Sequence, residues 1–128
     1  YQNDANAAAY GEFWVGSGRD AKSMALFTLG TGVGGGVILD GEIVTGEHSH
    51  GGELGHQRIE PPDRGRLCGC GARGCLEAYA SATQVVLRAR EAMAAWRGPT
   101  KLKQYYTAND DEFTSKEVYD TLDLCLSC

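Results

Sequence analysis

Apolar and polar positions near the start of the chain predict a helix followed by a strand. An alanine-rich stretch over residues 5–12 follows Asn3 and Asp4. The short side-chain oxygen of either residue can cap a helix by accepting its first free N–H groups. Residues 24–29 are apolar on both alternating faces except at Thr28. This pattern predicts a central strand that is covered on two sides.

The next segment predicts a hairpin and then a long irregular region. Seven residues, Gly30 to Gly36, include five glycines and lead into apolar residues 37–39. Asp40-Gly41 separates these from residues 42–45, and Asp-Gly between apolar runs is typical of a tight hairpin turn. Residues 46–74 show no periodicity. An irregular segment of that length needs a functional reason or a structural staple.

The last third of the chain is predicted to be largely helical. A stripe of apolar residues over 75–96 has helical spacing and ends before Gly98-Pro99, which predicts one long helix. Residues 101–113 are mostly polar and predict a surface loop. Thr114 and Glu117 have the spacing of a capping box, which predicts a final helix after them.

Composition and charge exclude some classes of partner. The 128 residues carry a net charge of −5 and no cluster of Lys and Arg, so we expect no nucleic-acid partner for this segment. No stretch approaches the ~20 apolar residues of a membrane span. Most of the 18 glycines lie between residues 11 and 74, which favours tight turns and close backbone approach to ligands in this region. Because the sequence starts without methionine and stops inside a helical pattern, we expect an internal fragment.

Four residues of metal-binding types, one histidine and three cysteines, lie close together in the irregular region. One imidazole and three thiolates make a complete tetrahedral set for a structural zinc ion, with no open position for catalysis. The intervening glycines allow the backbone to turn so that the sulfurs converge. The candidate ligands are His56, Cys68, Cys70 and Cys75.

Other interpretations of these residues remain open from the sequence. The cysteines could be free buried thiols or could form a disulfide pair, although three cysteines in eight residues among glycines suit a core poorly. His48 and His50 are rival fourth ligands. Thiolates held for zinc favour a reducing compartment, so we expect a cytoplasmic protein.

Four ordered motifs over residues 3–77 resemble the ROK family of sugar kinases and related repressors, and within it the bacterial glucokinases. The motifs are Asn3-Asp4-Ala5-Asn6-Ala7-Ala8, Leu29-Gly30-Thr31-Gly32-Val33-Gly34-Gly35-Gly36, Gly52-Glu53-Leu54-Gly55-His56 and Cys68-Gly69-Cys70-Gly71-Ala72-Arg73-Gly74-Cys75-Leu76-Glu77. The resemblance implies the α/β fold of actin-like and hexokinase-like ATPases (ribonuclease H-like), present in part. Residues 1–20 would end the first, small domain. Residues 21–128 would begin the second, large domain and include a zinc loop over 46–77.

The resemblance also implies roles for individual residues. Asp4 would be the catalytic base, and a carboxylate at a helix N-terminus suits that role. The implied sugar contacts are Asn3, Asp4, Glu53, His56 and Glu77. Gly30, Thr31 and Gly32 would face the phosphates of ATP. The glycines also fit the dinucleotide pattern Gly-x-Gly-x-x-Gly, but that pattern requires a following helix, and here a strand and a hairpin follow.

The spacing suggests how zinc and sugar sites are related. Glu53 lies three residues before the ligand His56, and Glu77 lies two residues after the ligand Cys75. One zinc ion would therefore tether both sugar carboxylates. His56 could bind the metal through one ring nitrogen and donate to the sugar through the other.

The resulting functional hypothesis is ATP-dependent phosphorylation of a hexose, glucose to glucose 6-phosphate, with Mg²⁺. Kinases of N-acetylmannosamine, N-acetylglucosamine, fructose or allose, and a sugar-responsive ROK repressor, are the alternatives. Retention of Asp4 and of Gly30-Thr31-Gly32 favours a kinase over a repressor. We expect the full-length protein to be a homodimer and the fragment alone to be inactive.

Overall fold

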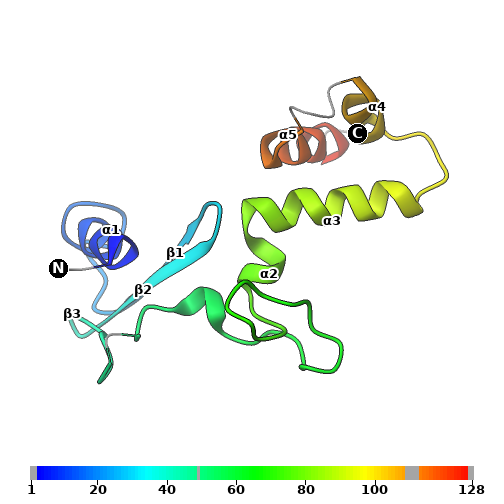
Figure 1. The fold of residues 1–128 in the computed structure, drawn as a ribbon. Coiled ribbons are helices and arrows are strands. Elements are labelled where there is room, and N and C mark those ends of the chain that lie inside the picture. The colour runs from blue at the N-terminus through cyan, green and yellow to red at the C-terminus, as the bar shows by residue number, and fades with distance from the viewer. Residues whose placement is uncertain (1–2, 49, 109–112, 127–128) are drawn as a thin grey trace.

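The chain has a mixed α/β fold in the computed structural model, which describes residues 3–48, 50–108 and 113–126 (Figure 1). This confirms the predicted α/β class. None of the described helices has the length and hydrophobicity that a membrane span requires. The elements in order are α1 (Asp4–Trp14), β1 (Met24–Leu29), β2 (Val33–Leu39), β3 (Glu42–Ile43), the 3₁₀ helix η1 (Leu54–His56), α2 (Glu77–Ala80), α3 (Ala82–Ala95), α4 (Lys101–Ala108) and α5 (Ser115–Leu126).

The three strands form an antiparallel sheet in the order β1-β2-β3. Asp40 and Gly41 connect β2 to β3 with φ angles of 49° and 86°. Both angles lie in the left-handed region, as a two-residue hairpin turn that matches strand twist requires. The predicted Asp-Gly hairpin is confirmed.

Strand β1 is not central, contrary to the sequence prediction. Within the described residues β1 pairs only with β2, so β2 is the middle strand. Phe27 and Leu29 on one face of β1 are 45% and 64% exposed. An apolar sequence indicates that both faces can be buried, but it does not specify which elements cover them. In the described residues only the face towards α1 is covered.

Helix α1 packs closely on β2 because small residues meet on both elements. Asn3 caps the helix as predicted, accepting the N–H of Ala5 at 3.0 Å. Ala9 is fully buried, and a Cβ atom added at Gly36 would lie 2.6 Å from the Ala9 Cβ. The segments assigned to two domains, 1–20 and 21–128, are therefore in contact here. The domain boundary itself stays a prediction.

The single long helix predicted over residues 75–96 is wrong, because it divides into α2 and α3 at Ser81. Ser81 has extended backbone angles, φ −65° and ψ 151°, and its side chain accepts the N–H of Gln84 at 3.4 Å. A serine hydroxyl that caps a new helix in this way competes with continuation of the old one. Because the helical spacing of apolar residues continues across Ser81, the sequence pattern gave no indication of the break.

The polar loop predicted over residues 101–113 is also wrong in part, since residues 101–108 form α4. The side-chain oxygen of Thr100 accepts the N–H of Lys103 at 2.9 Å at the start of this helix. Tyr106 then packs edge-on against Phe113, with ring centroids 5.4 Å apart. A small core of α3, α4 and α5 forms around Met93 and Phe113. Residues 109–112 lie outside the described residues.

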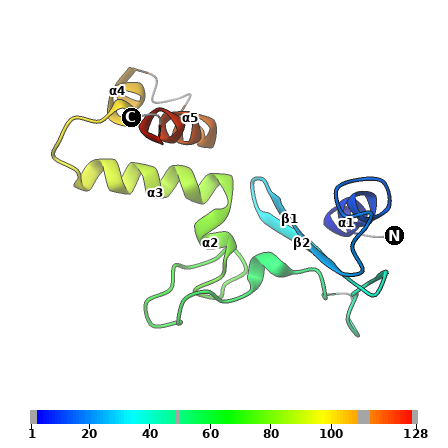
Figure 2. The same ribbon diagram turned by 180° about the vertical axis from the view of Figure 1, so that it is seen from behind.

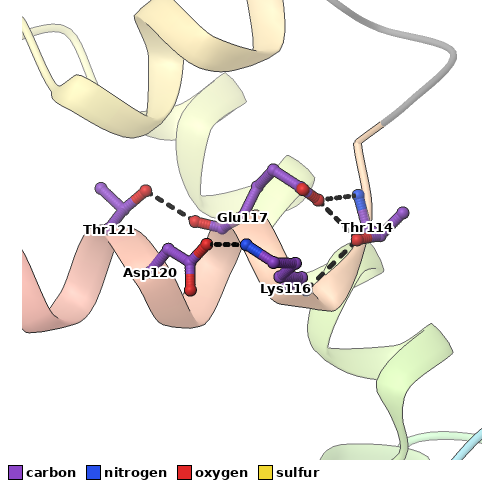
Figure 3. A network of polar contacts seen from close by, with 5 residues as sticks. All are labelled: Thr114, Lys116, Glu117, Asp120 and Thr121. Carbon is purple, nitrogen blue, oxygen red and sulfur yellow. Dashed lines mark hydrogen bonds and ion pairs between the residues drawn. The ribbon is translucent and has the colours of Figure 1, made fainter.

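The capping box predicted before the last helix is confirmed (Figure 3). The backbone N–H of Thr114 donates to the Glu117 carboxylate at 2.8 Å, and the N–H of Lys116 donates to the Thr114 hydroxyl at 3.2 Å. Two N–H groups at the start of α5 are thus satisfied by side chains. Helices α3, α4 and α5 lie together, apart from the sheet (Figure 1).

Candidate functional site

Four predicted metal ligands meet in the structure. One ligand atom from each residue, the imidazole of His56 and the sulfurs of Cys68, Cys70 and Cys75, lies within 4.8 Å of the others. His56 Nδ1 is 3.7 Å from the Cys68 sulfur, and the Cys70 and Cys75 sulfurs are 3.8 Å apart. Zinc bonds of about 2.3 Å to sulfur and 2.0 Å to nitrogen in a tetrahedron separate ligand atoms by about 3.5–3.8 Å. The donor set and its spacing therefore fit a closed zinc site.

The loop that carries the cysteines is shaped by glycines and short backbone hydrogen bonds. The N–H of Cys68 donates to the Ala72 carbonyl at 2.8 Å, and the N–H of Gly71 donates to the Cys68 carbonyl at 3.0 Å. Gly71 and Gly74 have φ angles of 87° and 84°. A side chain at either position would be strained in this conformation. The glycines thus allow three sulfurs within eight residues to converge.

The structure shows free thiols and argues against two of the alternatives for these residues. All three cysteines are free thiols, and a sulfur separation of 3.8 Å is far longer than the ~2.05 Å of a disulfide. Among the described histidines, His56 alone joins the cluster, while His48 and His50 are exposed loop residues outside it. The disulfide interpretation and the two rival histidines are therefore not supported.

The protein environment shifts the pKa values of the three thiols in different directions. Burial raises the pKa of the Cys68 thiol to about 12 and also raises the pKa of Cys75. The backbone N–H of Ala72 lowers the pKa of the more exposed Cys70 thiol. Zinc binds thiolates, so a bound ion would displace the protons from the buried thiols. Metal affinity at this site should therefore fall as the pH falls.

His56 connects the cysteine cluster with one of the predicted sugar carboxylates. Its Nδ1 atom faces Cys68, while its Nε2 atom lies 4.0 Å from the Glu53 carboxylate. The Glu53 side chain is 45% exposed and can therefore reach a ligand in solvent. The two ring nitrogens thus point to different partners, as a histidine that serves both a metal and a second polar group requires.

Strand β2 holds the segments around this site together because its middle is made of glycines. Leu54 of η1 packs on Gly35, where an added Cβ would lie 2.6 Å from the leucine side chain. Gly52, next to Glu53, lies against the Gly35 carbonyl and the side-chain amide of Asn6 from α1. Asp4 at the start of α1 and Glu53 are consequently attached to the same strand. The structure thus brings together motifs that are about 50 residues apart in the sequence.

The glycine turn between β1 and β2 contacts Glu77, the other predicted sugar carboxylate. Glu77, at the start of α2, accepts the N–H of Val33 at 3.0 Å. The N–H of Gly30 is used within the turn, where it donates to the Gly32 carbonyl at 3.0 Å. In the part of the chain that the structure describes, the N–H groups of Thr31 and Gly32 make no hydrogen bond. These two groups, with the exposed Thr31 hydroxyl, remain able to meet an anionic ligand.

Asn6 is a buried polar residue next to the candidate site for which the sequence predicted no role. It is only 6% exposed, and its amide oxygen has no hydrogen-bond partner among the residues that the structure describes. The amide lies against Gly36 and Gly52, so it fills the junction of α1, β2 and the loop before Glu53. The sequence did contain a signal for this burial, because Asn6 lies three positions before Ala9 and therefore on the same face of the helix.

A pair of glycine substitutions tests this geometry. A Cβ atom at Gly55 would lie 2.0 Å from the Val33 carbonyl oxygen, so Gly55→Ala must displace η1 from β2. We expect the thermal midpoint to fall by an amount corresponding to about 1–3 kcal/mol of overpacking, and zinc to be retained less firmly. The matched variant Gly69→Ala places its Cβ in open space inside the cysteine loop and should change neither property. Equal melting temperatures and equal zinc retention for the two variants would contradict the packing of η1 on β2.

The chain is similar in sequence to bacterial sugar kinases. The sequence pattern of the ROK family matches residues 1–123. A glucokinase of Halalkalibacterium halodurans is 44% identical over 125 residues, which is 94% of this chain and 36% of that protein. An N-acetylmannosamine kinase of Citrobacter koseri is 44% identical over 92 residues, 72% of this chain and 31% of that protein.

Solved structures of the same family resemble the chain as well. A ROK glucokinase from Streptomyces griseus, in complex with glucose and AMPPNP, is 44% identical with a TM-score of 0.67, covering 73% of this chain and 30% of that one. A ROK transcriptional regulator, a homologue of the E. coli MLC protein, is 32% identical with a TM-score of 0.75, covering 94% of this chain and 28% of that one. The chain spans 36% of the glucokinases of Halalkalibacterium halodurans and Thermotoga maritima and 31% of the N-acetylmannosamine kinase. Since the family pattern covers almost the whole sequence, the chain belongs to the ROK family.

Proposed function

We propose that the whole protein transfers the γ-phosphoryl group of ATP to a hexose, with glucose as the first candidate substrate. One observation carries the proposal: helix α1, which begins with Asp4, and the 3₁₀ helix η1, which follows Glu53 and ends with His56, both pack against the same strand, β2. The similar proteins include glucokinases and an N-acetylmannosamine kinase. A carboxylate at a helix start, facing solvent beside further polar groups, is suited to binding and deprotonating a polyol.

In the proposed reaction Asp4 takes the proton from the attacking sugar hydroxyl. The hydroxyl oxygen forms a bond to the γ-phosphorus, and the bond from that phosphorus to the bridging oxygen breaks, so that ADP leaves with the electron pair. Asn3, Glu53, His56 and Glu77 position the sugar hydroxyls for this step. Gly30, Thr31 and Gly32 meet the phosphates of ATP, whose charge Mg²⁺ partly neutralises. Positioning supplies most of the catalysis in such transfers.

A structural zinc ion belongs to the same proposal. His56, Cys68, Cys70 and Cys75 would hold it, and its role would be to fix the loop rather than to take part in the chemistry. Support comes from the ligand spacing and from the burial of Cys68 and Cys75, which are 4% and 1% exposed. Reduced cysteines favour the cytoplasm. A homodimeric whole protein remains a prediction.

A sugar-responsive repressor is the second candidate, because the chain also resembles a ROK transcriptional regulator with a TM-score of 0.75. Asp4 and the exposed Thr31 in an intact glycine turn favour the kinase, since a repressor needs neither a base nor a phosphate contact. The glucokinase relatives support glucose as the substrate, while the N-acetylmannosamine kinase relative supports N-acetylmannosamine.

The deciding experiment is a phosphorylation assay of the purified whole protein. Mg²⁺-ATP is supplied with glucose, N-acetylmannosamine, N-acetylglucosamine, fructose or allose in separate reactions, and ADP release is measured. We expect the largest kcat/KM with glucose. Fastest turnover of another sugar would correct the substrate but keep the reaction. Absence of turnover with every sugar, together with sugar-dependent DNA binding, would replace the kinase proposal by the repressor.

A further inference from the structure

We infer that Glu77 is a positioning residue for the glycine turn 30–32, in addition to its proposed sugar contact. The inference rests on the proposed function, because that function assigns the turn to the phosphates of ATP. Glu77 would thereby connect the sugar pocket physically with the nucleotide site. Three features of the structure support this role: a hydrogen bond, a close approach at Gly32, and a second attachment of the same turn.

The first feature is the hydrogen bond from the Val33 N–H to the Glu77 carboxylate, 3.0 Å long. Val33 starts β2 directly after the turn and is only 6% exposed, so water has little access to this residue. A buried N–H without an acceptor destabilises the conformation that buries it. Glu77 supplies an acceptor from 44 positions further along the chain.

The second feature explains the glycine at position 32. A Cβ atom at Gly32 would lie 2.7 Å from the same Glu77 carboxylate oxygen that accepts from Val33. The carboxylate therefore occupies the space in which a side chain would stand. At Gly30 an added Cβ would meet nothing within 4 Å. A side chain at position 32 would thus have to displace the Glu77 carboxylate, whereas one at position 30 would not.

The third feature is an attachment of the opposite end of the turn. The N–H of Ala82, at the start of α3, donates to the Gly30 carbonyl at 2.8 Å. Figures 1 and 2 show from both sides that the tip of the β1–β2 hairpin lies beside the junction of α2 and α3. Glu77 and Ala82 flank this junction and hold the two ends of the turn. Helix α2 begins with Glu77, two positions after the last cysteine of the loop, Cys75. Glu77 therefore connects the cysteine loop with the glycine turn.

A carboxylate can serve both roles at once. Its two oxygens offer about four lone-pair positions, of which the Val33 N–H uses one. The other oxygen of Glu77 lies 3.6 Å from the Cys68 sulfur. Glu77 is only partly buried, so room remains for a sugar hydroxyl on its exposed side. Binding of the sugar would then restrain the carboxylate that holds the phosphate turn.

The test compares Glu77→Ala, Glu77→Gln and Glu53→Ala in the zinc-loaded whole protein. The first measurement is hydrogen exchange of the Val33 amide without ligands. Glu77→Ala should accelerate this exchange at least about tenfold, because a charge-assisted hydrogen bond is lost. Glu77→Gln should keep most of the protection, since its amide oxygen still accepts. Glu53→Ala, which removes the other proposed sugar carboxylate of this region, should leave Val33 unchanged.

The second measurement is the Kd of AMPPNP in the absence of sugar. We expect Glu77→Ala to weaken binding about fivefold or more, with Glu77→Gln near the wild type and Glu53→Ala unchanged. Unchanged Val33 exchange or unchanged AMPPNP affinity in Glu77→Ala would overturn the inference. Wild-type protein that binds no AMPPNP would instead overturn the proposed kinase function, and the exchange measurement would still decide whether Glu77 holds the turn.

A double-mutant cycle adds an independent check on the close approach. Gly32→Ala alone should accelerate exchange of the Val33 amide, because the new methyl group displaces the carboxylate. In the Glu77→Ala background Gly32→Ala should have little further effect, since the clash is gone. Gly30→Ala, with open space around its Cβ, should leave Val33 exchange unchanged in both backgrounds. Equal effects of Gly32→Ala in the two backgrounds would contradict the proposed contact.

Discussion

Replacement of Asp4 by asparagine in the whole protein is expected to lower kcat for hexose phosphorylation by at least about 10²-fold. Asparagine has nearly the same shape and its side-chain oxygen can still accept the Ala5 N–H, which Asp4 accepts at 2.8 Å. The start of α1 should therefore be preserved. What is lost is the ability to take the proton from the attacking hydroxyl. Steady-state kinetics with saturating glucose and Mg²⁺-ATP measure the effect.

A matched substitution separates loss of the base from loss of charge. Asp20 is an exposed aspartate in the loop after α1, and its carboxylate forms an ion pair with the neighbouring Arg19 at 3.5 Å. Asp20→Asn should keep kcat within twofold of the wild type. The KM for the sugar should change much less than kcat in Asp4→Asn, because the amide retains hydrogen-bonding capacity. Near-normal turnover of Asp4→Asn would refute the assignment of Asp4 as the base.

Removal of one thiol is expected to empty the metal site. The native protein should contain about one zinc ion per chain, since four ligands complete a tetrahedron. Cys68→Ser should bind almost none, because Cys68 is 4% exposed and a serine hydroxyl there is a poor ligand. Loss of zinc should also lower the affinity for glucose, since Glu53 lies three residues before the ligand His56 and Glu77 lies two residues after the ligand Cys75. Metal analysis by mass spectrometry and calorimetry with glucose measure the two effects.

Two controls make this result interpretable. His50→Gln changes an exposed histidine outside the cluster and should keep both zinc and sugar affinity, whereas His56→Gln should lose zinc. Treatment of the wild type with a strong chelator should reproduce the loss of sugar affinity, and added zinc should restore it. Native protein that contains no zinc would disprove the metal site. Cys68→Ser protein that loses zinc but keeps its sugar affinity would disprove the bracing role.

The elements that were predicted correctly depend on residues a few positions apart. Asn3 caps α1 through the N–H of Ala5, two residues away. Thr114 and Glu117 form their capping box over three residues. The hairpin follows from the positive φ angles that Asp40-Gly41 adopts. Such features can be recognised from residue type and spacing alone, because the interacting groups are fixed by the local backbone.

The wrong predictions of strand order and helix boundaries concern segments whose structure depends on distant parts of the chain or on a single polar residue. The edge position of β1 follows from pairing partners, which its apolar sequence does not specify. Residues 101–108 look polar, yet they form α4 because Leu102 and Tyr106 pack onto a core shared with α3 and α5. At Ser81 a buried hydroxyl starts a second helix inside a continuous apolar stripe. Tertiary packing overrides weak local preference in such segments.

For the site, the sequence by itself determined the residue types: one histidine and three cysteines at metal-ligand spacing, and the four motifs of the ROK family. The sequence already named His56 as the ligand, with His48 and His50 as rivals, and the structure places His56 with the thiols. Only the tertiary structure decided that Glu77 bonds to Val33. The physical reason is distance along the chain. Ligand chemistry is a property of single side chains, whereas a hydrogen bond across 44 residues exists only after β2 and α2 have packed together.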